Sequence, residues 1–282
     1  EPFVRPHPMA DANGKIPVSV RVPAGMTAQS FGMREVAPGV GAIRLSPLEL
    51  ETFAAAHPAL PIFAGPSIRP QLDRVAKWLG TEDLRASLPE GTGRGRGVVV
   101  GVVDTGIDVT HPAFRTEDGR TRIQWLITWG DPRGVHPELE AAYGCTDLSQ
   151  APCAIYSSED IDAMLSNQRP IPDDVRDFAG HGTHVAGIAG GSGRTLAGEG
   201  TKFAGVAPEA SLVIASPSPG GGFADDVVLR GTRFIFDRAE ELGMPAVVNL
   251  SLGGDFGPHD GTSPLEAGLA ALVGDDKPGR AI

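Results

Sequence analysis

Residues 97–104 constrain the fold more than any other segment of the chain. Five of these eight residues are valine. A continuous apolar run of this kind predicts a strand that is buried on both faces, as in a parallel sheet. Further along, helix patterns at 181–191 and 224–243 alternate with apolar strand patterns within 203–216 and 245–254. This alternation predicts an α/β domain in which helices cover both faces of a parallel sheet.

The first 68 residues have a different pattern. Three strand patterns surround one helix pattern, with the strands at 16–25, 41–45 and 60–65 and the helix at 46–56. Ser46 is the expected N-cap of that helix, followed by Pro47 at the first helical position and Glu49 at the third. We therefore expect a small α+β module at 1–68, ahead of the larger domain at 69–282.

Residues 113–178 are polar and predict a mostly irregular stretch, with short helices near 137–143 and 158–166. The two cysteines of the chain, Cys145 and Cys153, lie within it and are separated by seven residues. They form either a short disulfide that holds a loop in an oxidising compartment or two unrelated thiols, and their proximity favours the disulfide. Two cysteines are too few for a structural zinc site, so no metal site is predicted.

Composition narrows the class of protein. Hydrophobic residues make up 41% of the chain, which is enough for a sizeable core. The net charge of −11 argues against a nucleic-acid partner, because phosphates are met by basic surfaces. No stretch of about 18 apolar residues occurs, so no membrane-spanning helix is expected.

One predicted strand ends, and one predicted helix begins, at a side chain that is suited to catalysis. Asp104 follows the valine-rich strand, where functional residues of α/β sheets collect, although it could simply cap a turn. His181 opens a helix of small residues and is suited to proton transfer near neutral pH. His184 stands three residues later, but the H-E-x-x-H pattern is absent, and we interpret it as a packed or hydrogen-bonded structural histidine.

Three sequence motifs follow one another along the chain, namely D-T-G at 104–106, G-H-G-T-H-V-A-G at 180–187 and V-N-L-S-L-G-G at 248–254. This series resembles the subtilase family of serine proteases. The resemblance implies that Asp104 orients the imidazole and that His181 is the general base of an Asp/His/Ser triad that performs acyl transfer.

The resemblance also implies a substrate groove, with one wall at Ser251, Leu252 and Gly253. The glycine run Gly220, Gly221 and Gly222 would pair with an extended polypeptide substrate. No cofactor is required in such a protein, a structural calcium ion is compatible with it, and an extracellular or cell-envelope location is expected. Residues 1–68 would be the family's pro-segment, with an accessory module as the alternative.

The chain departs from the family at its nucleophile. Neither G-T-S-M-A nor A-A-G-N occurs. Ser263 stands in a G-T-S sequence, but Pro264 and Glu266 predict that it caps a helix. We therefore expect a fragment that stops before the catalytic serine, lacks activity alone, and has the C-terminal remainder of the same protease as its partner. The alternative is an inactive subtilase-like module that binds or inhibits peptides.

Overall fold

The computed structural model describes nine stretches of the chain, namely residues 14–37, 39–63, 75, 77–89, 92–147, 151–195, 203–216, 223–253 and 260–282. The chain divides into two compact units, Glu1–Pro70 and Gln71–Ile282. Among the described residues, none of the helices is both long and apolar enough to cross a bilayer.

The small unit is an antiparallel sheet with helices. Its strands lie in the order β2-β3-β1-β4, and its elements are β1 (Ile16–Arg21), a 3₁₀ turn (Ala28–Phe31), β2 (Arg34–Ala37), β3 (Val40–Leu45), α1 (Pro47–Ala56) and β4 (Ile62–Phe63). The predicted cap of α1 is present, because the Ser46 hydroxyl accepts from the N–H of Glu49 while the Glu49 carboxylate accepts from the N–H of Ser46. β2 was not predicted from the sequence.

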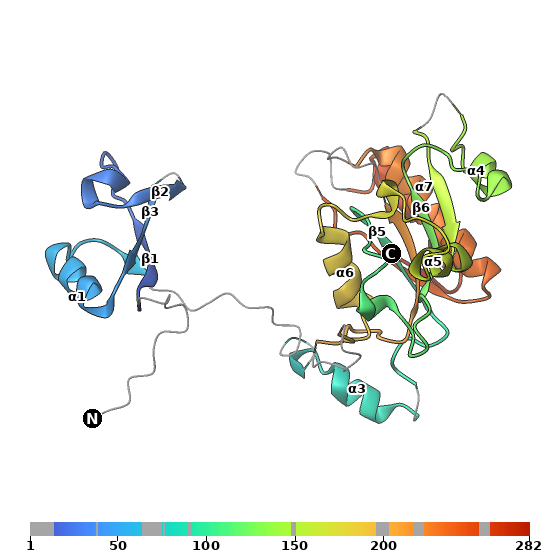
Figure 1. The fold of residues 1–282 in the computed structure, drawn as a ribbon, viewed down its shortest axis with the longest axis horizontal. Coiled ribbons are helices and arrows are strands. Elements are labelled where there is room, and N and C mark those ends of the chain that lie inside the picture. Colours follow the sequence, from blue (N-terminus) through green and yellow to red (C-terminus); the bar gives the residue numbers. More distant parts are fainter. Residues whose placement is uncertain are drawn as a thin grey trace. The chain divides into compact units, whose positions relative to one another are not determined.

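The large unit is built on a six-stranded sheet (Figure 1). Its strands lie in the order β10-β9-β5-β8-β6-β7 and span β5 (Val99–Val103), β6 (Ile123–Thr128), β7 (Ala154–Ser157), β8 (Ser211–Ser216), β9 (Ala246–Asn249) and β10 (Arg280–Ala281). β5 lies between β8 and β9 and is parallel to both. All five of its residues are buried, so the predicted central strand is confirmed.

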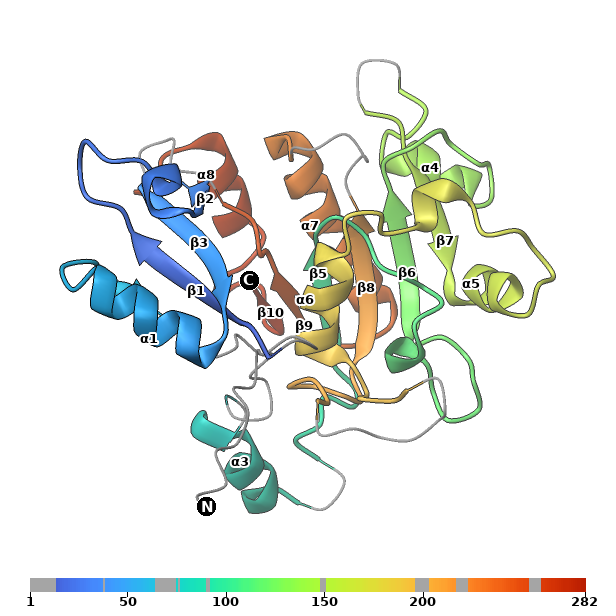
Figure 2. The same cartoon turned by 60° about the vertical axis from the view of Figure 1, so that its left-hand side comes forward.

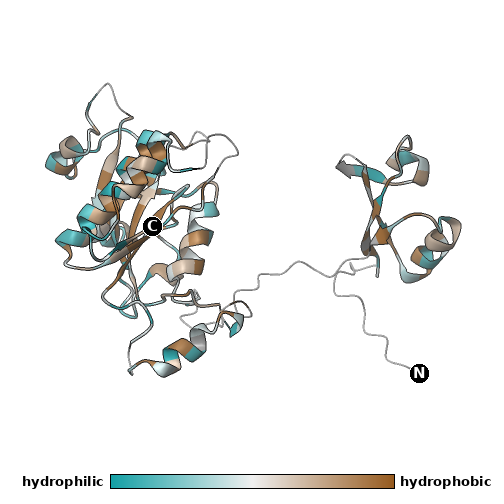
Figure 3. Ribbon diagram, turned by 180° about the vertical axis from the view of Figure 1, so that it is seen from behind, coloured by the Kyte–Doolittle hydropathy of each residue, from teal (hydrophilic) through white to brown (hydrophobic). Residues whose placement is uncertain are grey.

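Two hydrophobic clusters cover the two faces of this sheet. Alternate valines of β5 belong to different clusters: Val99 and Val103 pack with α7 (Asp225–Glu241), whereas Val100 and Val102 pack with α6 (His181–Gly190). Figure 2 shows α6 in front of the strands and α7 behind them. Hydrophobic residues concentrate on these strands (Figure 3). The predicted α/β class with helices on both faces is confirmed.

The expectation of a mostly irregular 113–178 stretch was wrong. The two helices are present as α4 (Pro137–Ala142) and α5 (Ser158–Leu165), but β6 and β7 also lie there and complete one side of the sheet. β7 is antiparallel to β6, so the sheet is parallel except at this edge. Both strands are short, and polar residues interrupt the apolar pattern of β6, which conceals them in the sequence. The remaining elements are α3 (Thr81–Ser87), α8 (Pro264–Ala270) and 3₁₀ turns at Pro112–Phe114 and Asp173–Val175.

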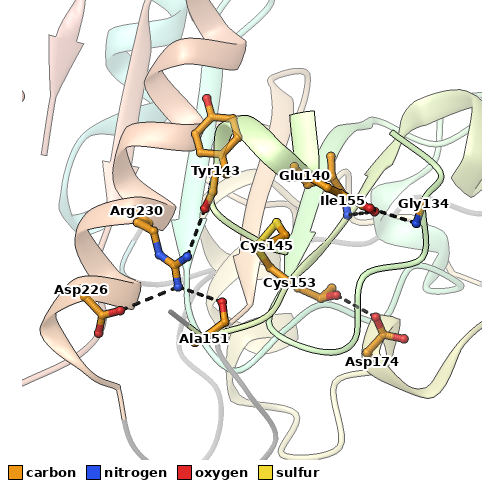
Figure 4. Close-up of a disulfide and its surroundings, with 11 residues drawn as sticks. Gly134, Glu140, Tyr143, Cys145, Ala151, Cys153, Ile155, Asp174, Asp226 and Arg230 are labelled. Carbon is orange, nitrogen blue, oxygen red and sulfur yellow. Dashed lines mark hydrogen bonds and ion pairs between the residues drawn. A yellow bond between two sulfur atoms is a disulfide. The ribbon is translucent and has the colours of Figure 1, made fainter. Parts of the chain in front are cut away.

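Cys145 and Cys153 form the disulfide expected from the sequence, and it lies beside the start of β7 (Figure 4). Arg230, on α7, donates one hydrogen bond to the carbonyl of Tyr143 and another to the carbonyl of Ala151, each at 3.1 Å. The disulfide closes the loop, and these two bonds hold it against α7.

Candidate active site

Asp104 directly follows β5, and its side chain is completely buried. Its carboxylate oxygen Oδ1 accepts one hydrogen bond from the N–H of Thr105 and one from Nδ1 of His181, both at 2.7 Å. The second oxygen, Oδ2, is buried without a hydrogen-bond partner among the described residues. A buried carboxylate needs polar partners, so His181 is one of the two groups that satisfy Asp104.

His181 is the first residue of α6, and its side chain is about half exposed, at 53%. A carboxylate can only accept hydrogen bonds, so the proton between the two side chains sits on Nδ1 of His181. Neutral His181 therefore carries its free lone pair on Nε2. The hydrogen bond and the negative charge of Asp104 raise the pKa of His181, and the charge of Asp177 adds to this effect.

Two glycines allow the strand end and the helix to approach each other. Gly106 has φ = 137°, a conformation that side chains rarely adopt. A Cβ atom on Gly182 would lie 2.2 Å from the carbonyl oxygen of Gly106 and 3.1 Å from Cβ of Asp104. The glycine of the G-H-G sequence is thus required by the close contact that brings His181 to Asp104.

Asp177 joins the two motifs and was not predicted from the sequence. Its Oδ1 accepts from the hydroxyl of Thr105 and the N–H of Gly180, and its Oδ2 accepts from the N–H and hydroxyl of Thr183, all between 2.7 and 2.9 Å. Burial alone would raise the pKa of Asp177, but these hydrogen bonds outweigh it and hold the pKa below its usual value. The only sequence signal was an acidic residue four positions before His181.

The Thr105 hydroxyl completes this network. It donates to Asp177 and accepts from the N–H of Gly182 at 2.9 Å. The Thr183 hydroxyl similarly accepts from the N–H of Asp108 at 2.8 Å. Side chains of each motif therefore bond to the backbone of the other, and the Asp104–His181 geometry is held from several directions.

The model of the subtilase family matches residues 95–277, a segment that contains both Asp104 and His181. The chain belongs to the subtilase family. Among curated relatives, it is similar to the subtilisin-like protease PopC of Myxococcus xanthus, with 30% identity over 183 residues, 62% of this chain and 29% of the relative. It is also similar to the PII-type proteinase of Lacticaseibacillus paracasei, with 29% identity over 64% of this chain and 9% of the relative.

Among solved structures, the chain is similar to the CspB protease of Clostridium perfringens. The identity is 30%, the TM-score is 0.49, and the match covers 64% of this chain and 34% of that protein. The chain therefore spans about a third or less of each of these three subtilase-related proteins.

The groove residues expected in a subtilase are only partly described. β9 is parallel to β5, with Asn249 opposite Val102. The segment after β9 therefore emerges at the carboxyl end of the strands, as Asp104 does. Ser251 and Gly253 are exposed there, whereas Leu252 packs against the hydrophobic cluster on the α7 face. Gly220, Gly221 and Gly222 lie outside the described residues.

The structure also describes Ser263 and His184, two residues for which the sequence predicted a structural role. Ser263 caps α8 in a capping box with Glu266, as its sequence context predicts. His184 is exposed and makes no side-chain hydrogen bond among the described residues, so its interpretation as a packed or hydrogen-bonded histidine was wrong. Within the described stretches, no three His, Cys, Asp or Glu side chains are grouped so that they could hold a metal ion.

Proposed function

We propose that this chain supplies the Asp–His part of a subtilisin-type serine endopeptidase. The observation that carries the proposal is the 2.7 Å hydrogen bond between Nδ1 of half-exposed His181 and Oδ1 of fully buried Asp104. Membership of the subtilase family, whose model spans both residues, supports the same assignment.

In this proposal, Asp104 holds the imidazole in the tautomer that leaves Nε2 unprotonated. Nε2 of His181 takes the proton of a serine hydroxyl as that oxygen attacks the scissile carbonyl. The imidazolium is stabilised by the buried carboxylate and then gives the proton to the leaving amine. Water repeats the cycle on the acyl-enzyme and releases the second product.

The nucleophile in this proposal is a serine from a C-terminal segment of the same protease, outside the 282 residues. Two described serines in and after the V-N-L-S-L-G-G motif, Ser251 and Ser263, have other hydrogen-bond roles. The hydroxyl of Ser263 is engaged in its helix cap, and that of Ser251 donates to Oδ1 of Asn249 at 2.8 Å. Among the described residues, His181 has no hydrogen bond to a serine.

The substrate in this proposal is a polypeptide bound in extended form. One wall of its groove is formed by Ser251, Leu252 and Gly253, and Gly220–Gly222 pair with the peptide backbone. The disulfide between Cys145 and Cys153 supports an extracellular or cell-envelope location, because such bonds persist in oxidising compartments. Residues 1–68 act as a pro-segment or as an accessory module.

The test compares the 282-residue chain with the same chain extended by the downstream sequence of its gene. We expect casein hydrolysis and fluorophosphonate labelling only in the extended protein. Asp104→Asn should lower its kcat by about four orders of magnitude, because the wrong tautomer is then favoured. His181→Ala should abolish turnover, whereas His184→Ala, an exposed position on the same helix, should leave it unchanged.

Two results would contradict the proposal. Full activity of the His181→Ala variant would remove this residue from the mechanism. An extended protein that binds peptides without cutting them would instead identify the inactive peptide-binding or inhibitory module considered from the sequence.

A further inference from the structure

A hollow of about 700 Å³ lies at the amino-terminal ends of β6 and β8. Its lining includes five arginines and two glutamates: Arg94, Arg96, Arg115, Arg122, Arg194, Glu117 and Glu209. These seven side chains carry a formal charge of +3, although the whole chain carries −11. The hollow is therefore a concentration of positive charge on an acidic protein.

Arg122 is a buried cation that lines this hollow. Its guanidinium donates to the backbone carbonyls of Ala113, Gly190 and Ala210. Among the described carboxylates, none lies within ion-pairing distance of it. Burial lowers the pKa of Arg122 to about 10, and the charge of Glu209 only partly opposes this. Buried charges are costly without a counter-ion, so an anion in the hollow would stabilise Arg122.

Two further arginines of the hollow, Arg115 and Arg194, are only partly engaged by other groups of the protein. Arg115 donates from Nη2 to the carbonyl of Thr110, but its Nε is buried without a hydrogen-bond partner among the described residues. Arg194 lies 3.6 Å from Glu117, whose side chain is 94% exposed, so this pair is weak. Arg94 and Arg96, in contrast, share the carboxylate of Glu209.

We propose that this hollow binds clustered carboxylates, from either a free polycarboxylate or an acidic peptide. Guanidinium groups match carboxylates in charge and in planar geometry, and several of them together select an anion with more than one negative group. β5, β6 and β8 are parallel to one another, so they all begin at one end of the sheet and finish at the other. The hollow lies at the end where they begin, and Asp104 lies at the opposite end. This binding site is independent of the proposed protease activity.

The test is isothermal titration calorimetry of the 282-residue chain with citrate and, separately, with tetraglutamate. We expect at least one probe to bind, with an affinity that falls as sodium chloride is raised. Arg194→Gln should weaken binding about tenfold, through loss of a charge-assisted contact. Glu117→Gln should strengthen it, because it removes a competing carboxylate. Tighter binding of citrate identifies a free anion as the ligand class, and tighter binding of tetraglutamate identifies an acidic peptide.

Matched controls make the result specific to the hollow. Arg233→Gln removes an exposed arginine on α7, and Glu51→Gln removes an exposed glutamate on α1, so both should leave binding unchanged. The proposal is overturned if neither probe binds at millimolar concentration, or if Arg194→Gln weakens binding no more than Arg233→Gln does. If Arg194→Gln impairs folding, Glu117→Gln decides, because its exposed side chain can change without disturbing the core.

Discussion

The substitution Gly182→Ala tests whether close contact between α6 and the end of β5 sets the Asp104–His181 geometry. The added Cβ would lie 2.2 Å from the carbonyl oxygen of Gly106, which is 0.8 Å inside the 3.0 Å limit that real Cβ atoms respect. The obstacle is backbone on both sides, so no side chain can rotate away. The start of α6 must therefore move by about 0.8 Å or more relative to Gly106.

A movement of this size would break the hydrogen bond between the motifs. Adding about 0.8 Å to the 2.7 Å between Nδ1 of His181 and Oδ1 of Asp104 takes it to or beyond the hydrogen-bonding limit. We expect the pKa of His181 to fall towards its usual value. Overpacking of this kind costs about 1–3 kcal/mol, which corresponds to a lower Tm by roughly 2–12 °C in a unit of this size.

The pH dependence has a defined sign. In the wild-type chain the pKa of His181 is raised by Asp104, so this pair stabilises the fold fully below the unfolded-state value of about 6.5. The contribution is lost as the pH rises through the folded-state value. The difference in Tm between wild type and Gly182→Ala should therefore be larger at pH 6 than at pH 9. Because His181 is half exposed, solvent screening keeps this part of the difference small.

The assay is an NMR titration of the His181 ring together with thermal unfolding. Gly187→Ala is the matched control, since it lies on the same helix and a Cβ there meets nothing within 4 Å. That variant should keep the wild-type pKa of His181 and gain up to about 1 kcal/mol from the better helix propensity of alanine. If Gly182→Ala behaves like Gly187→Ala in both measurements, the close-contact explanation is wrong.

Two further predictions concern the groups that hold the site and the cysteine loop. Asp177→Asn removes a charge and replaces one carboxylate oxygen, which accepts two hydrogen bonds, by an NH2 donor. The pKa of His181 should therefore fall in an NMR titration, whereas Asp173→Asn, at an exposed position, should leave it unchanged. Replacing Cys145 and Cys153 together by serine should lower the free energy of unfolding by about 2.5 kcal/mol, the loop-closure value for a loop of this length. Equal denaturation midpoints for the oxidised wild type and the double variant would contradict the loop-closure estimate.

The central strand of the fold was predictable because β5 is buried on both faces. The valine run of β5 is unmistakable in sequence, since a parallel central strand tolerates few polar residues. β9 alternates buried and exposed residues, but its apolar run still indicates a strand. β6 and β7 were missed because they lie towards the sheet edge and are only six and four residues long. β7 also runs directly into α5, so its short apolar pattern is not separated by a turn.

Residues of the candidate site could be predicted from the sequence where their type is suited to one kind of chemistry. Residues that only position other groups could not be predicted in this way. An aspartate after a buried strand and a histidine at a helix start suggest a proton-transfer pair. Asp177 contributes only through the groups that converge on its carboxylate, and these come from Thr105, Gly180 and Thr183. Such convergence depends on three-dimensional contact and leaves no periodic pattern in the sequence.

The way α6 is held at both ends determines how strain from Gly182→Ala should spread. At its C-terminal end, Arg122 donates to the carbonyl of Gly190, and Cδ2 of Leu212 lies 2.8 Å from where a Cβ on Gly190 would stand. These contacts anchor that end, so we expect the helix to tilt about it and not to slide as a rigid body. The methyl resonances of Leu212 should then stay at their wild-type positions while the His181 ring signals move. Displacement of both sets together would show that the helix slides, and the contact with Gly106 would then not be relieved locally.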